Sequence, residues 1–186
     1  MNSKKNKVEY IAGEVISIKA VGKGTRVCVD CADELSPEEG MLVGNTGDGY
    51  ILVLSENRNT ETYPSRAFRV NCGAVHQYIY EGENTKYLSE LRGGEQTPVF
   101  SLSGEPRIVP LGRVKAEQRD LLRVECRVQN KIISATLQDA DSVQLAGEEG
   151  NSVPVQQLAS GDRVLCMVDE PGRHLGEKIK EEIREY

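Results

Sequence analysis

Apolar and polar residues alternate along most of the chain, and glycine-rich turns separate the alternating runs. A period of two is typical of strands, whose successive side chains point to opposite faces. The runs are short and closely spaced, so we expect an all-β fold of many short antiparallel strands in barrel-like or sandwich subdomains. The predicted strands are a first one beginning at 15–18, then 26–30, 41–43, 50–54, 68–80, 99–102, 108–115, 121–128, 131–137, 143–145, 153–156 and 163–168.

Turn signals support this reading. The segment Asn45-Thr-Gly-Asp-Gly49 separates two apolar runs and predicts a hairpin, because Asn, Asp and Gly tolerate positive φ. A faint repeat places a glycine-containing turn before a strand at 35–40, 91–95 and 158–162. Only residues 178–186 have a helical pattern, which is weak, so we expect a short C-terminal helix at most.

The domain organisation follows from the same pattern. Residues 1–9 are polar and predict a flexible tail, and residues 10–186 predict a single all-β domain. The polar segment 113–120 is a candidate connection between two sub-barrels, and a division is expected near residue 85.

Composition narrows the class of protein. The 186 residues include no Trp and two Phe, so the core must consist mainly of Val, Ile and Leu. The net charge of −6 argues against nucleic-acid binding but leaves room for a local basic pocket that binds a small anion. No signal-peptide pattern and no run of about 18 apolar residues occurs, so we expect a cytoplasmic protein without a membrane span.

The five cysteines are an odd number, which favours reduced thiols. Cys28 and Cys31 have CxxC spacing, but a zinc ribbon needs a second pair and a redox motif should precede a helix. Buried thiols on a strand are the better interpretation. The segment 21–24 is too short for a phosphate loop, and no G-x-G-x-x-G occurs to support a Rossmann dinucleotide site.

The segment 65–80 carries unusual polar residues for a strand. Arg66, Arg69, Asn71 and His76 lie among its apolar residues, and Gly73 interrupts it. A lone histidine is more often a structural hydrogen-bonding group than a catalyst. The residues alone therefore leave both readings of His76 open.

Other polar residues could join this segment. Glu56 ends a neighbouring strand, and His174 lies next to Arg173 in the glycine-bracketed segment 171–176. Arg, His and Glu side chains together would bind a carboxylate and move protons, or hold a divalent metal. Glu125 and Gln138 also interrupt apolar strands, but with a period of two they could equally point to solvent.

Several phrases, in order along nearly the whole chain, resemble the archaeal-type (type II) 3-dehydroquinate synthases. The family's core phrase is similar to VNAGAVH, with Cys72 here in place of its alanine. The phrases are RVCVD (26–30), EGMLVG (39–44), FRVNCGAVH (68–76), YLSEL (87–91), GRVK (112–115), LLRVE (121–125), LQDA (137–140) and GRHLG (172–176).

The resemblance implies a cyclase of aromatic amino acid biosynthesis. Its substrate would be an acyclic aminated C7 keto acid, of the 2-amino-3,7-dideoxy-hept-6-ulosonate type. The family removes the amine oxidatively with NAD and closes the ring to 3-dehydroquinate. Similar enzymes make an aminohydroxybenzoate with a divalent metal, Mn or Mg. Either reaction requires a carboxylate site and general acid–base groups.

The resemblance also implies roles for the candidate residues. His76, Glu56 and His174 would transfer protons, and Glu56 and His76 would be metal ligands. Glu125 and Gln138 would be further site residues. The substrate would contact Arg66, Arg69, Asn71, Gly73 and Arg173, with Gly73 allowing it to approach the backbone.

Two departures from the family matter. Its members are about twice this length, and the resemblance covers only their C-terminal half. In the family the second cysteine of the CVDC segment (28–31) would be expected one residue later, at Ala32. Three expectations follow. The chain is half of a split enzyme with a separate N-terminal subunit, or a complete cyclase acting as a homo-oligomer. Otherwise it is a non-catalytic module that binds a small acid or a partner.

Overall fold

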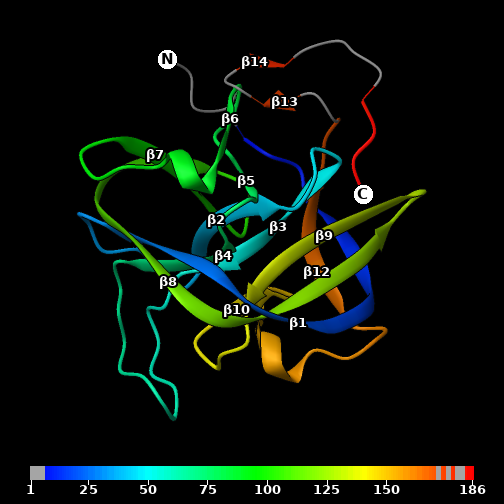
Figure 1. Cartoon of the computed structure of the whole chain (residues 1–186), viewed down its shortest axis with the longest axis horizontal. Helices are drawn as coiled ribbons and strands as arrows, with labels where there is room; N and C mark the ends of the chain where they lie inside the picture. Colours follow the sequence, from blue (N-terminus) through cyan, green and yellow to red (C-terminus); the bar gives the residue numbers. More distant parts are fainter. Residues whose placement is uncertain (1–6, 171–172, 175–176, 179–182) are drawn as a thin grey trace.

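Two long antiparallel strands run through the computed structural model, which describes residues 7–170 and 183–186 in full, and 173–174 and 177–178 by their backbone. They are β1 (Ile11–Cys31) and β8 (Pro106–Val128), paired from Glu14↔Arg127 to Cys31↔Leu111 (Figure 1). The sequence predicted each as two shorter strands, with 113–120 as a connector, and this prediction was wrong. The middle of both strands is largely exposed, so polar residues there do not end the strand.

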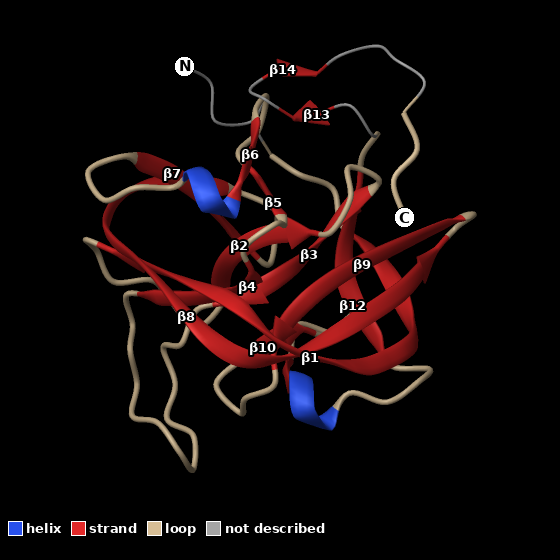
Figure 2. Ribbon diagram, viewed as in Figure 1, coloured by secondary structure: helices blue, strands red, loops and turns tan. Residues whose placement is uncertain are grey.

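The remaining strands close a barrel on this pair. A ring of six strands runs β3–β12–β1–β8–β7–β2 and returns to β3, and every pairing is antiparallel (Figure 2). β4 and β9 add to β1 and β8. The expectation of an all-β fold is confirmed. The elements are β2 (Glu39–Gly44), β3 (Gly49–Leu54), β4 (Arg69–Ala74), β5 (Tyr78–Tyr80), β6 (Thr85–Tyr87), η2 (Leu88–Glu90), β7 (Gln96–Ser101), β9 (Lys131–Gln138), β10 (Gln144–Ala146), β11 (Ser152–Pro154), η3 (Val155–Gln157) and β12 (Arg163–Val168).

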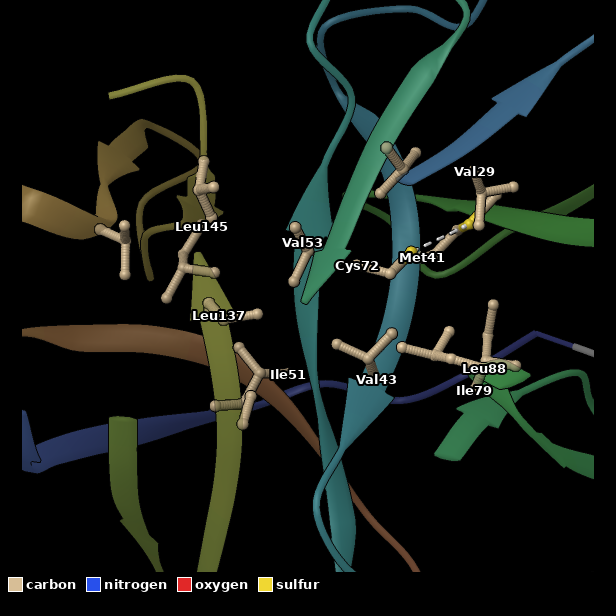
Figure 3. Close-up of a cluster of buried hydrophobic side chains, with 14 of the residues drawn as sticks. Val29, Met41, Val43, Ile51, Val53, Cys72, Ile79, Leu88, Leu137 and Leu145 are labelled. Atoms are coloured by element: carbon tan, nitrogen blue, oxygen red, sulfur yellow. Dashed lines mark hydrogen bonds between the residues drawn. The ribbon is translucent and has the colours of Figure 1, made fainter. Parts of the chain in front are cut away.

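The core lies on both faces of β2 and β3. Ile51 and Val53 point into the main cluster of buried Val, Ile and Leu side chains, while Tyr50 and Leu52 point into a smaller cluster on the opposite face. Side chains from β2, β3, β4, β9 and β10 meet in the main cluster (Figure 3). A strand covered on both faces loses its polar alternation, which explains the continuous apolar run at 50–54.

The cysteines are part of this core. All five are buried and free of disulfides, and Cys72 Sγ lies 3.7 Å from Met41 Sδ. The prediction of buried thiols on a strand is therefore confirmed for Cys28 and Cys31.

Some predicted boundaries were wrong. The strand expected at 68–80 is divided into β4 and β5, and the segment 153–156 is divided between β11 and η3. For 178–186 a short helix at most was expected, and residues 179–182 of this segment lie outside the described residues. Lys178 lies in β14 (Glu177–Lys178), paired with β13 (Arg173–His174), and 183–186 have no regular secondary structure. Glu185 instead accepts hydrogen bonds from the Tyr78 hydroxyl and the Gly47 N–H.

The division expected near residue 85 stays a prediction. Among the described residues, no helix has the length and apolar character needed to cross a membrane.

Candidate anion-binding site

A small pocket of about 140 Å³ collects most of the polar residues that the sequence singled out. We call it the arginine pocket. Its lining residues are Arg26, Glu56, Tyr63, Arg66, Arg69, Asn71, Lys115, Glu117, Arg119, Gln138 and Ser142.

The arginine pocket is built on one face of three adjacent strands, with β1 between β4 and β8. Arg26 in β1 lies opposite Glu117 in β8, and Cys28 lies opposite Asn71 in β4. Alternate residues of each strand share a face, so Val27 and Val29 point to the main core instead. The strand period thus separates a polar face from an apolar one.

The pocket is strongly cationic although the protein carries a net charge of −6. Five basic side chains line it, against two carboxylates. Three of the five, those of Arg26, Lys115 and Arg119, share the single carboxylate of Glu117, at N···O distances of 2.7, 3.7 and 2.9 Å. Positive charge therefore remains for an anionic ligand.

Arg26 is buried on this face, with only 5 % of its surface exposed. Its Nη2 donates to Glu117, and its Nη1 lies 2.6 Å from Cys28 Sγ. Burial raises the pKa of the Cys28 thiol to about 11, despite the nearby guanidiniums, so the sulfur does not neutralise Arg26 near pH 7. The buried Arg26 Nε has no hydrogen-bond partner.

Arg69 is fixed by a buried carboxylate behind the pocket. Its Nε and Nη2 donate to the two oxygens of Asp30, at 2.7 and 3.0 Å, and Arg113 donates to Asp30 as well. Burial alone would raise the pKa of Asp30, but the hydrogen bonds from both arginines outweigh it and lower that pKa. Asp30 is therefore a positioning residue for Arg69.

Glu56 is the carboxylate with the unusual environment. It is 3 % exposed, and its Oε1 forms a buried ion pair with Arg66 Nη2 at 2.6 Å. Burial raises the pKa of Glu56 above its ordinary value, against the opposing effect of Arg66 and Arg69. A carboxyl group whose pKa is raised keeps its proton to a higher pH than an exposed one.

Asn71 completes the pocket from β4 and is 2 % exposed. Its Nδ2 donates to Gln138 Oε1 at 2.8 Å, which leaves its Oδ1 without a partner. Within the described part of the chain, three buried atoms of this pocket have no polar partner: Arg26 Nε, Arg66 Nε and Asn71 Oδ1. Buried polar atoms are normally hydrogen-bonded, so this concentration indicates a site for a polar ligand.

The structure thus brings together five of the predicted site residues. Each of them lines the arginine pocket: Glu56, Arg66, Arg69, Asn71 and Gln138.

His76 lies at the other end of the same sequence phrase and has different neighbours. The exposed ring places Nε2 2.8 Å from Asn45 Oδ1, which also accepts a hydrogen bond from Thr136. Partial desolvation of the ring and the nearby Arg123 lower the pKa of His76, so it is neutral at pH 7. Its catalytic role stays a prediction.

Gly73 and Glu125 are also absent from the lining of the pocket. Gly73 has a φ of +88°, and a Cβ there would collide with the Thr136 carbonyl oxygen, so packing against β9 already requires glycine. Glu125 pairs with Arg123 at 3.3 Å. The side chains of Arg173 and His174 lie outside the described residues.

Sequence reasoning missed the contribution of the long strands. Arg26, Lys115, Glu117 and Arg119 line the pocket, yet the charged segment 113–120 resembles a connector when read alone. The overlooked signal was a period of two in the charged residues of this segment. Residues 113, 115, 117 and 119 are all charged, and in a strand they share one face.

The pocket residues do not fit a divalent metal or NAD. Glu56 is surrounded by guanidiniums, and Glu56 and His76 have different partners. The part of the chain described in full contains no group of three or more His, Cys, Asp or Glu that could hold a metal. At about 140 Å³ the pocket is also smaller than ordinary small-molecule sites, roughly 300–1,000 Å³.

Comparisons with known proteins give a consistent result. A family model described as the 3-dehydroquinate synthase II C-terminal domain matches residues 12–186. A 3-dehydroquinate synthase of Methanocella arvoryzae is 44 % identical over 92 % of this chain and 46 % of its own length. A 3-dehydroquinate synthase of Methanosarcina barkeri is 41 % identical over 96 % of this chain and 47 % of its own length. A 3-dehydroquinate synthase homolog of Aquifex aeolicus is 42 % identical over 96 % of this chain and 54 % of its own length.

The chain therefore spans about half the length of the curated relatives it matches. No solved structure matches the chain.

Proposed function

This chain belongs to the 3-dehydroquinate synthase II family through its C-terminal domain, and from that membership we propose that it serves a cyclase reaction. The substrate is an acyclic aminated C7 keto acid of the 2-amino-3,7-dideoxy-hept-6-ulosonate type. The arginine pocket binds its carboxylate. The chain acts as one half of a split enzyme, together with a separate N-terminal half.

The observation that carries this proposal is the set of unpaired buried atoms among the cations. A carboxylate has two oxygens that each accept more than one hydrogen bond. Arg26 Nε and Arg66 Nε are buried donors without partners in the described chain, and both line the same pocket. Charge-assisted hydrogen bonds to guanidinium are among the strongest that a carboxylate makes.

Glu56 supplies the proton transfer. Ring closure of the aldol type removes a proton from the carbon next to a ketone and delivers one to the alkoxide that forms. A carboxyl group with a raised pKa, in the same pocket as the bound acid, can serve in either direction. Asn71 Oδ1 is free to accept a hydrogen bond from a substrate O–H or N–H.

We assign only carboxylate binding and proton transfer to this pocket. Oxidative removal of the amine needs NAD, and the arginine pocket on its own, at about 140 Å³, has no room for a dinucleotide. The relatives have about as much chain again beyond the matched region, so we place the remaining binding groups on the N-terminal half.

The test supplies that half directly. The purified chain is incubated with the aminated C7 ulosonate, with and without NAD and Mn²⁺, either alone or with the separately expressed N-terminal half of the Methanocella arvoryzae relative. Mass spectrometry follows the cyclised product. We expect turnover only when both halves are present, and its loss in Arg66→Gln but not in Arg163→Gln, a matched change in an exposed pair with Glu148.

One outcome of this experiment would contradict the proposed cyclase function. Absence of turnover under every condition, with acid binding retained, would replace the enzyme with a module that binds a small acid.

A further inference from the structure

A second, larger pocket adjoins the arginine pocket. It has a volume of about 650 Å³, and Tyr63 and Gln138 line both pockets. The segment after β9 also contributes to both, because Ser142 lines the arginine pocket while Asp139 and Asp141 line the second one. The two pockets are therefore neighbours with shared walls.

The second pocket has a different chemistry. Five carboxamide side chains line it, and we call it the amide pocket; they belong to Asn59, Gln138, Gln144, Gln156 and Gln157. None of its lining residues, all of which the structure describes, is Lys, Arg or His. Carboxamides both donate and accept hydrogen bonds, as hydroxyl groups do, so the wall matches a polyhydroxylated chain better than a second anion or an apolar group.

Parts of this wall are fixed in place. Gln138 is 8 % and Gln144 5 % exposed, and Gln144 Nε2 donates to the Asp141 carbonyl oxygen at 3.0 Å. Gln156 Nε2 donates to Asp139 Oδ1 at 2.8 Å. Asp141 Oδ1 is buried and has no hydrogen-bond partner in the described chain, so an acceptor remains for a ligand hydroxyl or ammonium group.

One loop covers both pockets. Residues 55–68 connect β3 to β4 and project from the barrel (Figure 1). Within this loop, Asn59 and Tyr63 line the amide pocket, and Tyr63 also lies 4.5 Å from the Arg66 guanidinium. The Thr62 N–H donates to Asp141 Oδ2 at 3.2 Å, which joins the loop to the far wall.

We infer that the two pockets form one site for a hydroxylated carboxylic acid, with the carboxylate in the arginine pocket and the hydroxylated chain in the amide pocket. This orientation rests on the proposed function, because it takes the arginine pocket as the carboxylate site. It adds that hydroxyl groups on the ligand are selected by this chain and not only by the N-terminal half.

Two six-carbon acids test the inference on the chain itself. D-gluconate carries a hydroxyl group on every carbon after the carboxylate, and hexanoate carries none. Isothermal titration calorimetry should show gluconate binding at least tenfold more tightly than hexanoate. The double variant Gln156→Leu/Gln157→Leu, at two exposed positions of the amide pocket, should lose at least fivefold in gluconate affinity and leave hexanoate unchanged.

The controls separate this inference from the proposed function. Gln96→Leu, an exposed glutamine on β7, should change neither affinity, and Arg66→Gln should weaken both acids. Equal affinity for the two acids, both weakened by Arg66→Gln, would overturn the role of the amide pocket and leave the carboxylate site intact. Failure of both acids to bind would overturn the arginine pocket and, with it, the inference.

Discussion

The two ends of the phrase from Arg69 to His76 differ in how well their polar atoms are paired. At the first end, Asn71 Oδ1 lies buried without a partner beside guanidiniums that also carry unpaired nitrogens. At the other end, His76, Asn45 and Thr136 form a hydrogen-bonded group. The two ends look alike in the sequence, because both place polar residues in an apolar strand.

The difference shows how to distinguish a binding strand from a merely polar one. Satisfied polar groups stabilise the fold, whereas buried unsatisfied groups cost stability and persist where a ligand completes them. The site therefore lies where pairing is incomplete, at Asn71 and its neighbours. Substitutions at the two ends should have effects of very different size.

The largest effect is expected from Asp30→Asn, which removes the buried partner of Arg69 and Arg113. Breaking a buried ion pair costs about 3–5 kcal/mol, so the free energy of unfolding should fall by about that amount at pH 7. The pKa of Asp30 is lowered in the folded state, so its contribution is present above the unfolded-state pKa and is lost as the pH falls through the folded-state pKa. Urea denaturation at pH 7 and at lower pH measures both effects.

Asp33→Asn provides the matched control. Asp33 pairs with Arg107 at an exposed position, where solvent screens the pair, so its contribution to stability is small. A loss in Asp30→Asn no larger than that in Asp33→Asn would contradict the role given to Asp30.

A smaller effect is expected from Arg26→Gln, which removes one donor of the arginine pocket. Hydrogen bonds to charged groups contribute about 1.5–3 kcal/mol, so affinity for gluconate should fall by roughly 10- to 100-fold. Calorimetric titration measures the loss, with Arg163→Gln as the control on an exposed arginine. Unchanged affinity in Arg26→Gln would remove Arg26 from the site.

Glu56→Gln should alter stability in a pH-dependent way. The folded-state pKa of Glu56 is raised, so its contribution to stability is fully present below the unfolded-state pKa and is lost as the pH rises through the folded-state pKa. Glutamine imitates the protonated acid at every pH. The Tm of the variant should therefore match that of the parent protein at pH 4 and exceed it at pH 8.

The shift is measurable, since ~1 kcal/mol corresponds to roughly 2–4 °C for a protein of this size. If Glu56→Gln were less stable than the parent protein at pH 8, the ionised Glu56 carboxylate would stabilise the fold. That result would contradict the raised pKa of Glu56.

The smallest effect is expected at the paired end of the phrase. His76→Ala removes a hydrogen bond to Asn45 but no group of the arginine pocket, so gluconate affinity should change less than twofold. Calorimetry on this variant and on Arg26→Gln makes the comparison direct. A fivefold loss in His76→Ala would place the ring in the binding site.

Much of the fold could be predicted from the sequence, because short alternating or continuous apolar runs between turn residues mark most strands, including the fully buried β3. The prediction failed where a strand is exposed over its middle or is very short. The exposed middle of β1 and β8 resembles a linker, and β6 is too short to give a signal. The site was predicted in part: Glu56 and Arg66 to Asn71 are close in sequence, whereas Arg26 and Lys115 reach the pocket only through strand pairing.

The most direct test is a crystal structure of this chain with D-gluconate bound. We predict that the carboxylate lies within hydrogen-bond distance of Arg26 Nε and Arg66 Nε, with the hydroxylated chain directed past Gln138. A carboxylate bound elsewhere, with these nitrogens still unpaired, would contradict the assignment of the arginine pocket.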